Sequence, residues 1–121
     1  MGAYLLVALG SALGGAARHG VSEAILRHAD PAGVPWWTIL VNVTGSFAIG
    51  YLAQILPAES GDARAFLIAG LLGGYTTFSA FSLQTLDLAR AGDWAGAAVN
   101  VGVSVAACLI AVTLGFLAGR T

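Results

Sequence analysis

The segment Ala65–Leu86 reads AFLIAGLLGGYTTFSAFSLQTL and contains no charged residue. A helix of this length rises about 33 Å, which matches the roughly 30 Å hydrocarbon core of a bilayer. Near its centre, Gly73 and Gly74 are followed by Thr76 and Thr77, which are poor helix formers. The segment therefore predicts a transmembrane helix that is interrupted at membrane depth, where freed backbone groups must face protein, water or an ion.

Uncharged stretches occupy most of the remaining chain as well. They are Met1–Ala17, Pro31–Ala58 and Trp94–Gly119, with 17, 28 and 26 residues. Charged residues make up 9% of the 121 residues, against about 25% in soluble proteins, and 58% of the chain is hydrophobic. We therefore expect an all-α membrane protein with one domain, 1–121. Its four transmembrane helices are predicted over about 2–28, 35–56, 63–90 and 94–119.

The ends of these helices carry capping and interfacial residues. Glu23 and Arg27 stand four apart and predict a helical ion pair that extends the first helix beyond the bilayer edge. Trp36 and Trp94 suit the headgroup layer, and Asp93 is a predicted N-cap. The connections are short, so consecutive helices are expected to be antiparallel neighbours.

Composition and motifs exclude several classes of protein. Five arginines, no lysine and a net charge of −1 offer no basic surface for nucleic acid. The phosphate-loop, zinc-protease and dinucleotide motifs are missing. The four apolar stretches also offer no carboxylate as a catalytic group, so we predict no enzyme. The single cysteine, Cys108, excludes an intrachain disulfide and is interpreted as a packing residue. His19 and His28 are interpreted as interfacial side chains.

The arginines scarcely select an orientation in the membrane. Arg64 and Arg120 fall on the predicted side of the termini, whereas Arg18, Arg27 and Arg90 fall on the other. A difference of one arginine predicts insertion in both directions, and hence an antiparallel dimer. The alternative is a single orientation set by other features. Because no basic residue precedes the first apolar run, we expect that run to be a retained span and not a cleaved signal peptide.

Small and polar residues recur inside the predicted spans. Four glycine pairs with a spacing of four predict close helix contacts: Gly10/Gly14, Gly70/Gly74, Gly92/Gly96 and Gly115/Gly119. Polar side chains at membrane depth are Asn42, Thr44, Ser46, Thr76, Thr77, Ser79, Ser82, Gln84, Thr85, Asn100 and Ser104. The stripe through Asn100, Ser104 and Cys108 is compatible with a close helix contact or with a wet polar track.

Two aromatic residues follow the predicted break. Phe78 and Phe81 stand three apart on one helix face, where a phenyl ring can present its positive edge to an anion. The alternative interpretation is ordinary helix packing.

Three sequence blocks carry a family resemblance. They are Gly10…Gly14-Gly15…Arg18, then TILVNVTGSF over 38–47 with Gly50, and then Gly70…GGYTTFSAF over 73–81. Their order and spacing in a chain of this size resemble the CrcB/Fluc fluoride channels of bacteria over essentially the whole sequence.

The resemblance implies a passive, fluoride-selective channel that exports cytoplasmic fluoride across the bacterial inner membrane and confers fluoride resistance. It implies a multi-pass antiparallel homodimer with dual topology, two pores and a central structural Na⁺. The implied pore residues are Phe78 and Phe81 as the ring pair, Asn42 as an amide donor, and Asn100, Ser104 and Thr38 as the polar track. Backbone carbonyls of Gly73 and Thr76 would hold Na⁺, and Arg18 would lie near a vestibule.

Two departures and two alternatives accompany this resemblance. Ala80 stands where relatives commonly carry a hydroxyl, and His19 stands where an aromatic residue is common. A small multidrug exporter has a similar size, but it needs a carboxylate in its first span, and Met1–Ala17 has none. A non-conducting membrane assembly subunit is the other alternative.

Overall fold

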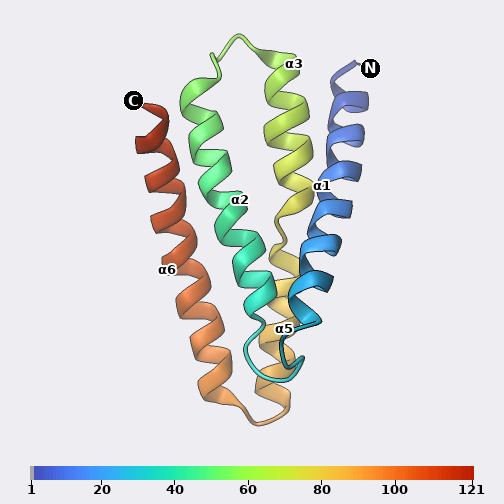
Figure 1. The fold of residues 1–121 in the computed structure, drawn as a ribbon, viewed down its shortest axis with the longest axis vertical. Coiled ribbons are helices and arrows are strands. Elements are labelled where there is room, and N and C mark those ends of the chain that lie inside the picture. Colours follow the sequence, from blue (N-terminus) through green and yellow to red (C-terminus); the bar gives the residue numbers. More distant parts are fainter. Residues whose placement is uncertain (1) are drawn as a thin grey trace.

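The computed structural model describes residues 2–121, and its regular structure is entirely helical. Three long helices are α1 (Gly2–Leu26), α2 (Trp36–Ile55) and α6 (Trp94–Gly119). The fourth path consists of α3 (Gly61–Arg64), the π-helix η1 (Ala65–Leu72), α4 (Gly73–Tyr75) and α5 (Phe78–Arg90). Figure 1 shows both chain ends and the α2–α3 connection at one end of the bundle, with the other two connections at the opposite end. Consecutive paths are therefore antiparallel.

Three helical segments in the described part of the chain are long and apolar enough to cross a membrane. They are Trp36–Ile55, Gly61–Arg90 and Trp94–Gly119. Helix α1 has 25 residues, enough for a crossing by length, but it contains Arg18, His19 and Glu23 in its second half. A membrane protein is thus supported by three segments, and the crossing by α1 stays a prediction.

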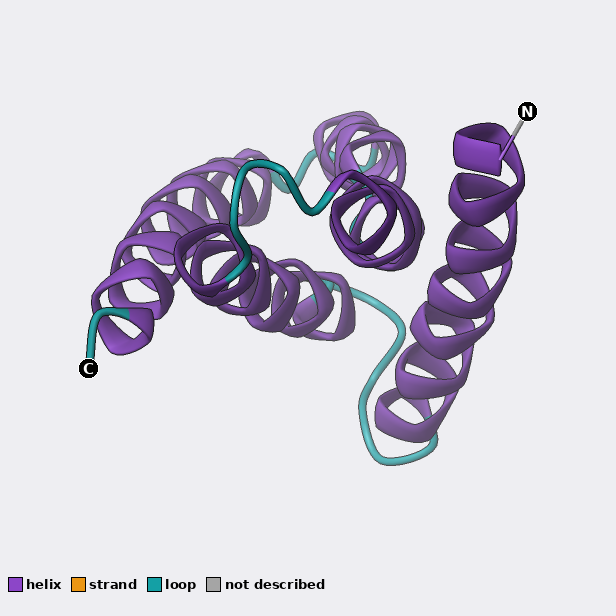
Figure 2. Cartoon of the chain, turned by 90° about the horizontal axis from the view of Figure 1, so that it is seen from above, coloured by secondary structure: helices purple, strands orange, loops and turns teal. Residues whose placement is uncertain are grey.

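Glycines form the closest helix contacts. A Cβ added at Gly10 or Gly14 of α1 would overlap backbone atoms of η1. A Cβ added at Gly74 of α4 would overlap the backbone of Ser11 in α1. Between α2 and α6, Gly50 faces the backbone of Val112. Such contacts replace the hydrophobic drive that is missing between helices in lipid. Figure 2 shows the resulting layout, with α1 at one edge of the bundle and α6 at the other.

One predicted glycine pair does not form a helix contact. Gly92 lies in the α5–α6 turn with φ of 83°, a left-handed conformation that favours glycine. Gly96 stands over the carboxylate of the N-cap Asp93, which accepts its N–H at 2.8 Å. The prediction of a Gly92/Gly96 packing motif is therefore wrong, because Gly92 forms the turn and Gly96 belongs to the N-cap of α6.

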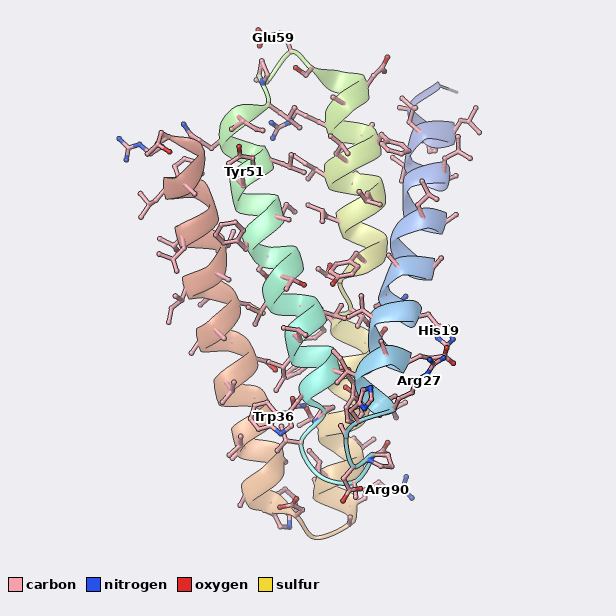
Figure 3. The ribbon with its side chains drawn as sticks, viewed as in Figure 1. His19, Arg27, Trp36, Tyr51, Glu59 and Arg90 are labelled. Atoms are coloured by element: carbon pink, nitrogen blue, oxygen red, sulfur yellow. The ribbon has the colours of Figure 1, made fainter. Side chains whose placement is uncertain are left out.

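The predicted ion pair in α1 also differs from the structure. Glu23 Oε1 lies 3.5 Å from Nε2 of His19, one turn earlier, and α1 ends at Leu26, before Arg27. The Arg27 N–H still donates to the Glu23 carbonyl at 3.1 Å, but the two side chains form no ion pair within 4 Å among residues 2–121, so the expected Glu23–Arg27 pair is wrong. Figure 3 shows His19 projecting outward from α1, and places Arg90 at the end of the bundle opposite Glu59.

Candidate functional site

The helical path of the third segment is broken at two threonines. Helix α4 ends at Tyr75, Thr76 adopts φ −85° and ψ 157°, and Thr77 adopts φ −148° and ψ 114°. Helix α5 then begins at Phe78, and the Thr77 hydroxyl caps it by accepting the Ala80 N–H at 3.1 Å. The preceding glycine, Gly73, keeps helical angles. The threonines, and not the glycines, thus form the non-helical segment.

Asn42 of α2 holds this segment with both ends of its amide. The Thr77 N–H donates to Asn42 Oδ1 at 2.8 Å, and Asn42 Nδ2 donates to the Thr77 carbonyl at 3.0 Å. The pair satisfies the extended peptide much as a neighbouring β-strand would. Because Nδ2 carries two hydrogens, one N–H of Asn42 remains for another acceptor.

The break frees the backbone carbonyls of the last helical turn, among them those of Gly73 and Thr76. In a continuous helix the Thr77 N–H would bond the carbonyl of Gly73, but it bonds Asn42. Likewise the Ala80 N–H, which would bond the carbonyl of Thr76, bonds the Thr77 hydroxyl. Gly73 and Thr76 therefore present carbonyl oxygens without their helical partners.

Arg18 of α1 reaches the same break from the other side. Its Nε donates to the Gly74 carbonyl at 3.2 Å, in a partly buried position. A cation at the C-terminal end of a helical segment is favoured by the helix dipole. Arg18 thus ties α1 to the end of α4.

An open groove of about 430 Å³ runs beside the break, and we call it the ring groove. Four predicted pore residues, together with Thr77 and Cys108, are among those that line it: Asn42, Phe78, Phe81 and Ser104. The two phenyl rings lie 5.2 Å apart between centroids and are tilted by 49°. Phe78 is 78% exposed, so this wall of the groove is open in the single chain.

A second hollow of about 190 Å³, the Arg18 pocket, lies between α1, α2 and α5. Arg18, Thr38 and Gln84 contribute polar groups to its lining, and Thr77 lines it as well. Gln84 Oε1 is buried and has no hydrogen-bond partner among residues 2–121. Thr77 lines both hollows, so the extended segment is the wall that they share.

Asn100 lies apart from both hollows. It is 1% exposed, donates through Nδ2 to Thr85 Oγ1 at 2.8 Å and accepts the Ser104 hydroxyl at 3.4 Å. The structure thus gathers Asn42, Phe78, Phe81 and Ser104 at the ring groove and puts Thr38 with Arg18, while Asn100 belongs to the α5–α6 contact.

The sequence placed Thr77 at the predicted break and Thr85 among the polar side chains at membrane depth, but it assigned neither a hydrogen-bonding role at the site. The i, i+4 spacing of Phe81 and Thr85 was an available signal, because it puts both on one helix face. No local pattern shows that Thr77, and not Thr76, pairs with Asn42 and caps α5.

Comparison with known proteins gives a consistent result. The profile described as CrcB-like protein, Camphor Resistance (CrcB), matches residues 5–116. A protein of Opitutus terrae named fluoride-specific ion channel FluC is 46% identical, covering 98% of this chain and 92% of its own. Proteins with the same name from Paramagnetospirillum magneticum and Hyphomonas neptunium are 48% and 47% identical, covering 95% and 99% of this chain and 93% and 97% of their own.

Long apolar helices, a broken segment and a groove with amide, hydroxyl and ring donors define the class of helical membrane proteins with polar groups between their helices. Within that class, the chain belongs to the CrcB family, whose named relatives are ion channels and not enzymes. This confirms the resemblance drawn from the three sequence blocks.

Proposed function

We propose that this chain forms a passive, fluoride-selective channel, since its relatives are named fluoride-specific ion channels. The observation that carries the proposal is the ring groove, where Phe78, Phe81, Asn42 and Ser104 meet beside a helix break. The remaining Asn42 N–H and the Ser104 hydroxyl are neutral donors, and the ring edges carry partial positive charge.

These donors suit a small and strongly hydrated anion. A pore must replace the water around fluoride without holding the ion so tightly that it cannot leave. Several weak donors in series meet both requirements, whereas a lysine in the groove would retain the anion. The shared wall at Thr77 supports a path that continues from the ring groove into the Arg18 pocket. There the positive charge of Arg18 would favour anion entry.

The functional unit we propose is an antiparallel homodimer with two pores. Phe78 is 78% exposed and the ring groove is open along one side, so a second copy would enclose it. Arg18 lies at the break, bonded to the Gly74 carbonyl, and the other arginines divide two to two between the ends of the chain's paths, Arg64 and Arg120 against Arg27 and Arg90. This balance supports insertion of the chain in both directions. With all four paths crossing the bilayer, the protein would reside in the bacterial inner membrane.

A structural Na⁺ fits the carbonyls of Gly73 and Thr76, which are among those released at the break. Carbonyl oxygens are hard, neutral ligands of the kind that replace the water around alkali cations. Gly73 and Thr76 would supply one pair from each copy, and Asn42 and the Thr77 hydroxyl keep those oxygens free by taking the competing N–H groups. The bound cation would neutralise the partial negative charge of the helix ends that meet at the dimer centre.

As a channel the protein would need no energy source. Hydrogen fluoride crosses membranes as a neutral molecule and dissociates inside a cell near neutral pH, so the anion accumulates. A selective pore lets that anion leave down its gradient and the membrane potential.

The test is fluoride release from liposomes that contain purified protein and are loaded with potassium fluoride. A fluoride electrode follows release after valinomycin is added, and potassium chloride liposomes measure selectivity. We expect rapid fluoride release with negligible chloride loss. Proton-coupled transport of a cationic drug, or no release from verified dimers, would overturn the proposal.

A variant pair connects the activity to the groove. Phe81→Ile should remove most fluoride release while the dimer still assembles, because it deletes a ring edge from the groove wall. Phe116→Ile is the matched control, since Phe116 is 44% exposed on α6 and does not line the ring groove. Unchanged release in Phe81→Ile would refute the role of the ring.

A further inference from the structure

We propose that the half-buried Thr85 and the buried Asn100 form a positioning pair, which fixes the rotation of α5 against α6 and so orients Phe81 toward the ring groove. The pair acts through the helix and does not itself contact the ion. The transport part of its test depends on the proposed channel function, whereas the pairing itself does not.

The Thr85 hydroxyl both donates and accepts a hydrogen bond. Thr85 Oγ1 donates to the carbonyl of Phe81 at 2.7 Å and accepts the Asn100 Nδ2–H at 2.8 Å. A hydroxyl has one proton, so the bond to Phe81 commits it and leaves lone pairs for Asn100. The side chain thus joins the backbone of α5, at the ring residue, to the interior of α6.

The burial of Asn100 makes this bond hard to replace. Asn100 is 1% exposed, and neither Asn100 nor Thr85 lines the ring groove or the Arg18 pocket. A buried amide that loses its partner pays its full desolvation cost, whereas an exposed one would bond to water. The pair therefore imposes one arrangement of the two helices.

The links continue to the groove on both sides. Asn100 Oδ1 accepts the hydroxyl of Ser104, one turn further along α6, at 3.4 Å. Ser104 and Phe81 both line the ring groove. A chain of three hydrogen bonds thus runs behind the groove wall and connects its α6 side to its α5 side.

Helix α5 requires such a link because its other connections to the bundle do little to fix its rotation about its own axis. It is 13 residues long, is separated from α4 by the extended Thr76 and Thr77, and ends at the left-handed Gly92 turn. Helix α6 is its most extensive packing partner, and its contact with α2 is slight. The rotation of α5 is therefore set largely by what it meets on α6.

The transport test replaces the hydroxyl without changing the shape. Thr85→Val should lower fluoride release about tenfold, equivalent to roughly 1.4 kcal/mol in the barrier, and should raise chloride leakage relative to fluoride. Thr85→Ser keeps the hydroxyl and should restore both release and selectivity. Thr113→Val is the matched control, because the Thr113 hydroxyl makes the same bond to a carbonyl four residues earlier, at 2.8 Å, from an exposed position on α6.

A double-mutant cycle tests whether the two residues act together. Asn100→Leu removes the bond to Thr85 and also the bond from Ser104, so it should lower release at least as much as Thr85→Val. The double variant should be no worse than Asn100→Leu alone, because the Thr85–Asn100 bond is already lost there. Additive losses, or an unchanged fluoride-to-chloride ratio in Thr85→Val, would overturn the positioning role.

A second measurement does not depend on transport. The chain has two asparagines, Asn42 and Asn100, so labelling with ¹⁵N-asparagine gives two side-chain amide signals that single variants assign. In the unmodified protein the Asn100 signal should exchange slowly in D₂O, and it should shift in Thr85→Val but not in Thr113→Val. Fast exchange in the unmodified protein would refute the pair even if Thr85→Val fails to fold. A slowly exchanging, Thr85-sensitive signal in a protein without fluoride transport would instead retain the pair and refute the channel proposal.

Discussion

The α2–α6 contact and the seating of α5 are built in opposite ways. Helix α2 meets α6 through glycines, and Gly50 and Gly115 each lie directly against the partner backbone. Helix α5 is held by side-chain hydrogen bonds, from Asn42 at its start and from Asn100 further along. The first contact is determined by shape and admits no added atoms. The second depends on specific donors and acceptors, so it fixes orientation at the groove and not the existence of the bundle.

The largest effect should come from disturbing the glycine contact. Gly115→Ala would place a Cβ against the Phe47 carbonyl. We expect it to cost at least about 3 kcal/mol of stability, at the upper end of overpacking effects. Thermal unfolding in detergent, followed by size-exclusion chromatography, measures this. Gly102→Ala is the control, because an added Cβ there meets nothing within 4 Å among the described residues, and it should be neutral or raise stability by about 0.5–1 kcal/mol. Equal stability of the two variants would show that close approach does not hold α2 to α6.

The next effect concerns the polar support of α5. Asn42→Ala leaves both the N–H and the carbonyl of Thr77 without their partner. We expect fluoride release to be nearly abolished and stability to fall by about 1–3 kcal/mol, the cost of unsatisfied buried groups. Liposome release and thermal unfolding report the two effects separately. Gln54→Ala, which removes an amide elsewhere on α2, is the control. A variant of Asn42 that conducts like the parent would exclude the residue from the pore and from its support.

A smaller effect is expected at the other face of the break. Arg18→Met removes the bond to the Gly74 carbonyl and the positive charge of the Arg18 pocket. Fluoride release should fall several-fold, and the loss should shrink as ionic strength rises, because salt screens the attraction of the anion. Arg18→Lys should recover part of the activity, and Arg27→Met, beyond the end of α1, should have little effect. A salt-independent loss would assign Arg18 to structure alone.

The smallest effect should come from Cys108. This half-buried side chain lines the ring groove and makes no hydrogen bond among residues 2–121. Cys108→Ser should change fluoride release by no more than about twofold, as for substitutions without a buried partner. A charged thiol reagent added to the parent protein should nevertheless block release, because it would fill the groove. Block that persists in Cys108→Ser would show that the reagent acts elsewhere.

The sequence predicted the helices better than the details of the break. Helix α6 occupies the predicted range 94–119, and α2 begins and ends one residue inside 35–56. Uncharged length carries that information, because the bilayer thickness sets how many residues a span needs. The π-helical segment η1 lies where Gly10 and Gly14 of α1 approach its backbone, and no local pattern encodes an approach by a distant segment. Nothing in the structure explains why Gly73 keeps helical angles.

The candidate site divides in the same way. The family resemblance implied Phe78, Phe81, Asn42 and Ser104 as pore residues, and all four line the ring groove. Spacing puts Phe78 and Phe81 on one helix face, whereas their meeting with Asn42 of α2 and Ser104 of α6 depends on how the helices pack. The hydrogen-bond partner of each polar side chain could not be predicted from the sequence. Asn42 forms hydrogen bonds with both the N–H and the carbonyl of Thr77, and this pairing depends on the tertiary arrangement.

The placement of both chain ends at one end of the bundle has a consequence for covalent assembly. A gene that joins Thr121 of one copy directly to the start of another would hold the two copies parallel. An antiparallel tandem would require one additional hydrophobic crossing of about 20 residues in the linker. Fusion proteins with and without that crossing therefore distinguish the two assemblies by function alone, and only the longer fusion should transport if the working pair is antiparallel.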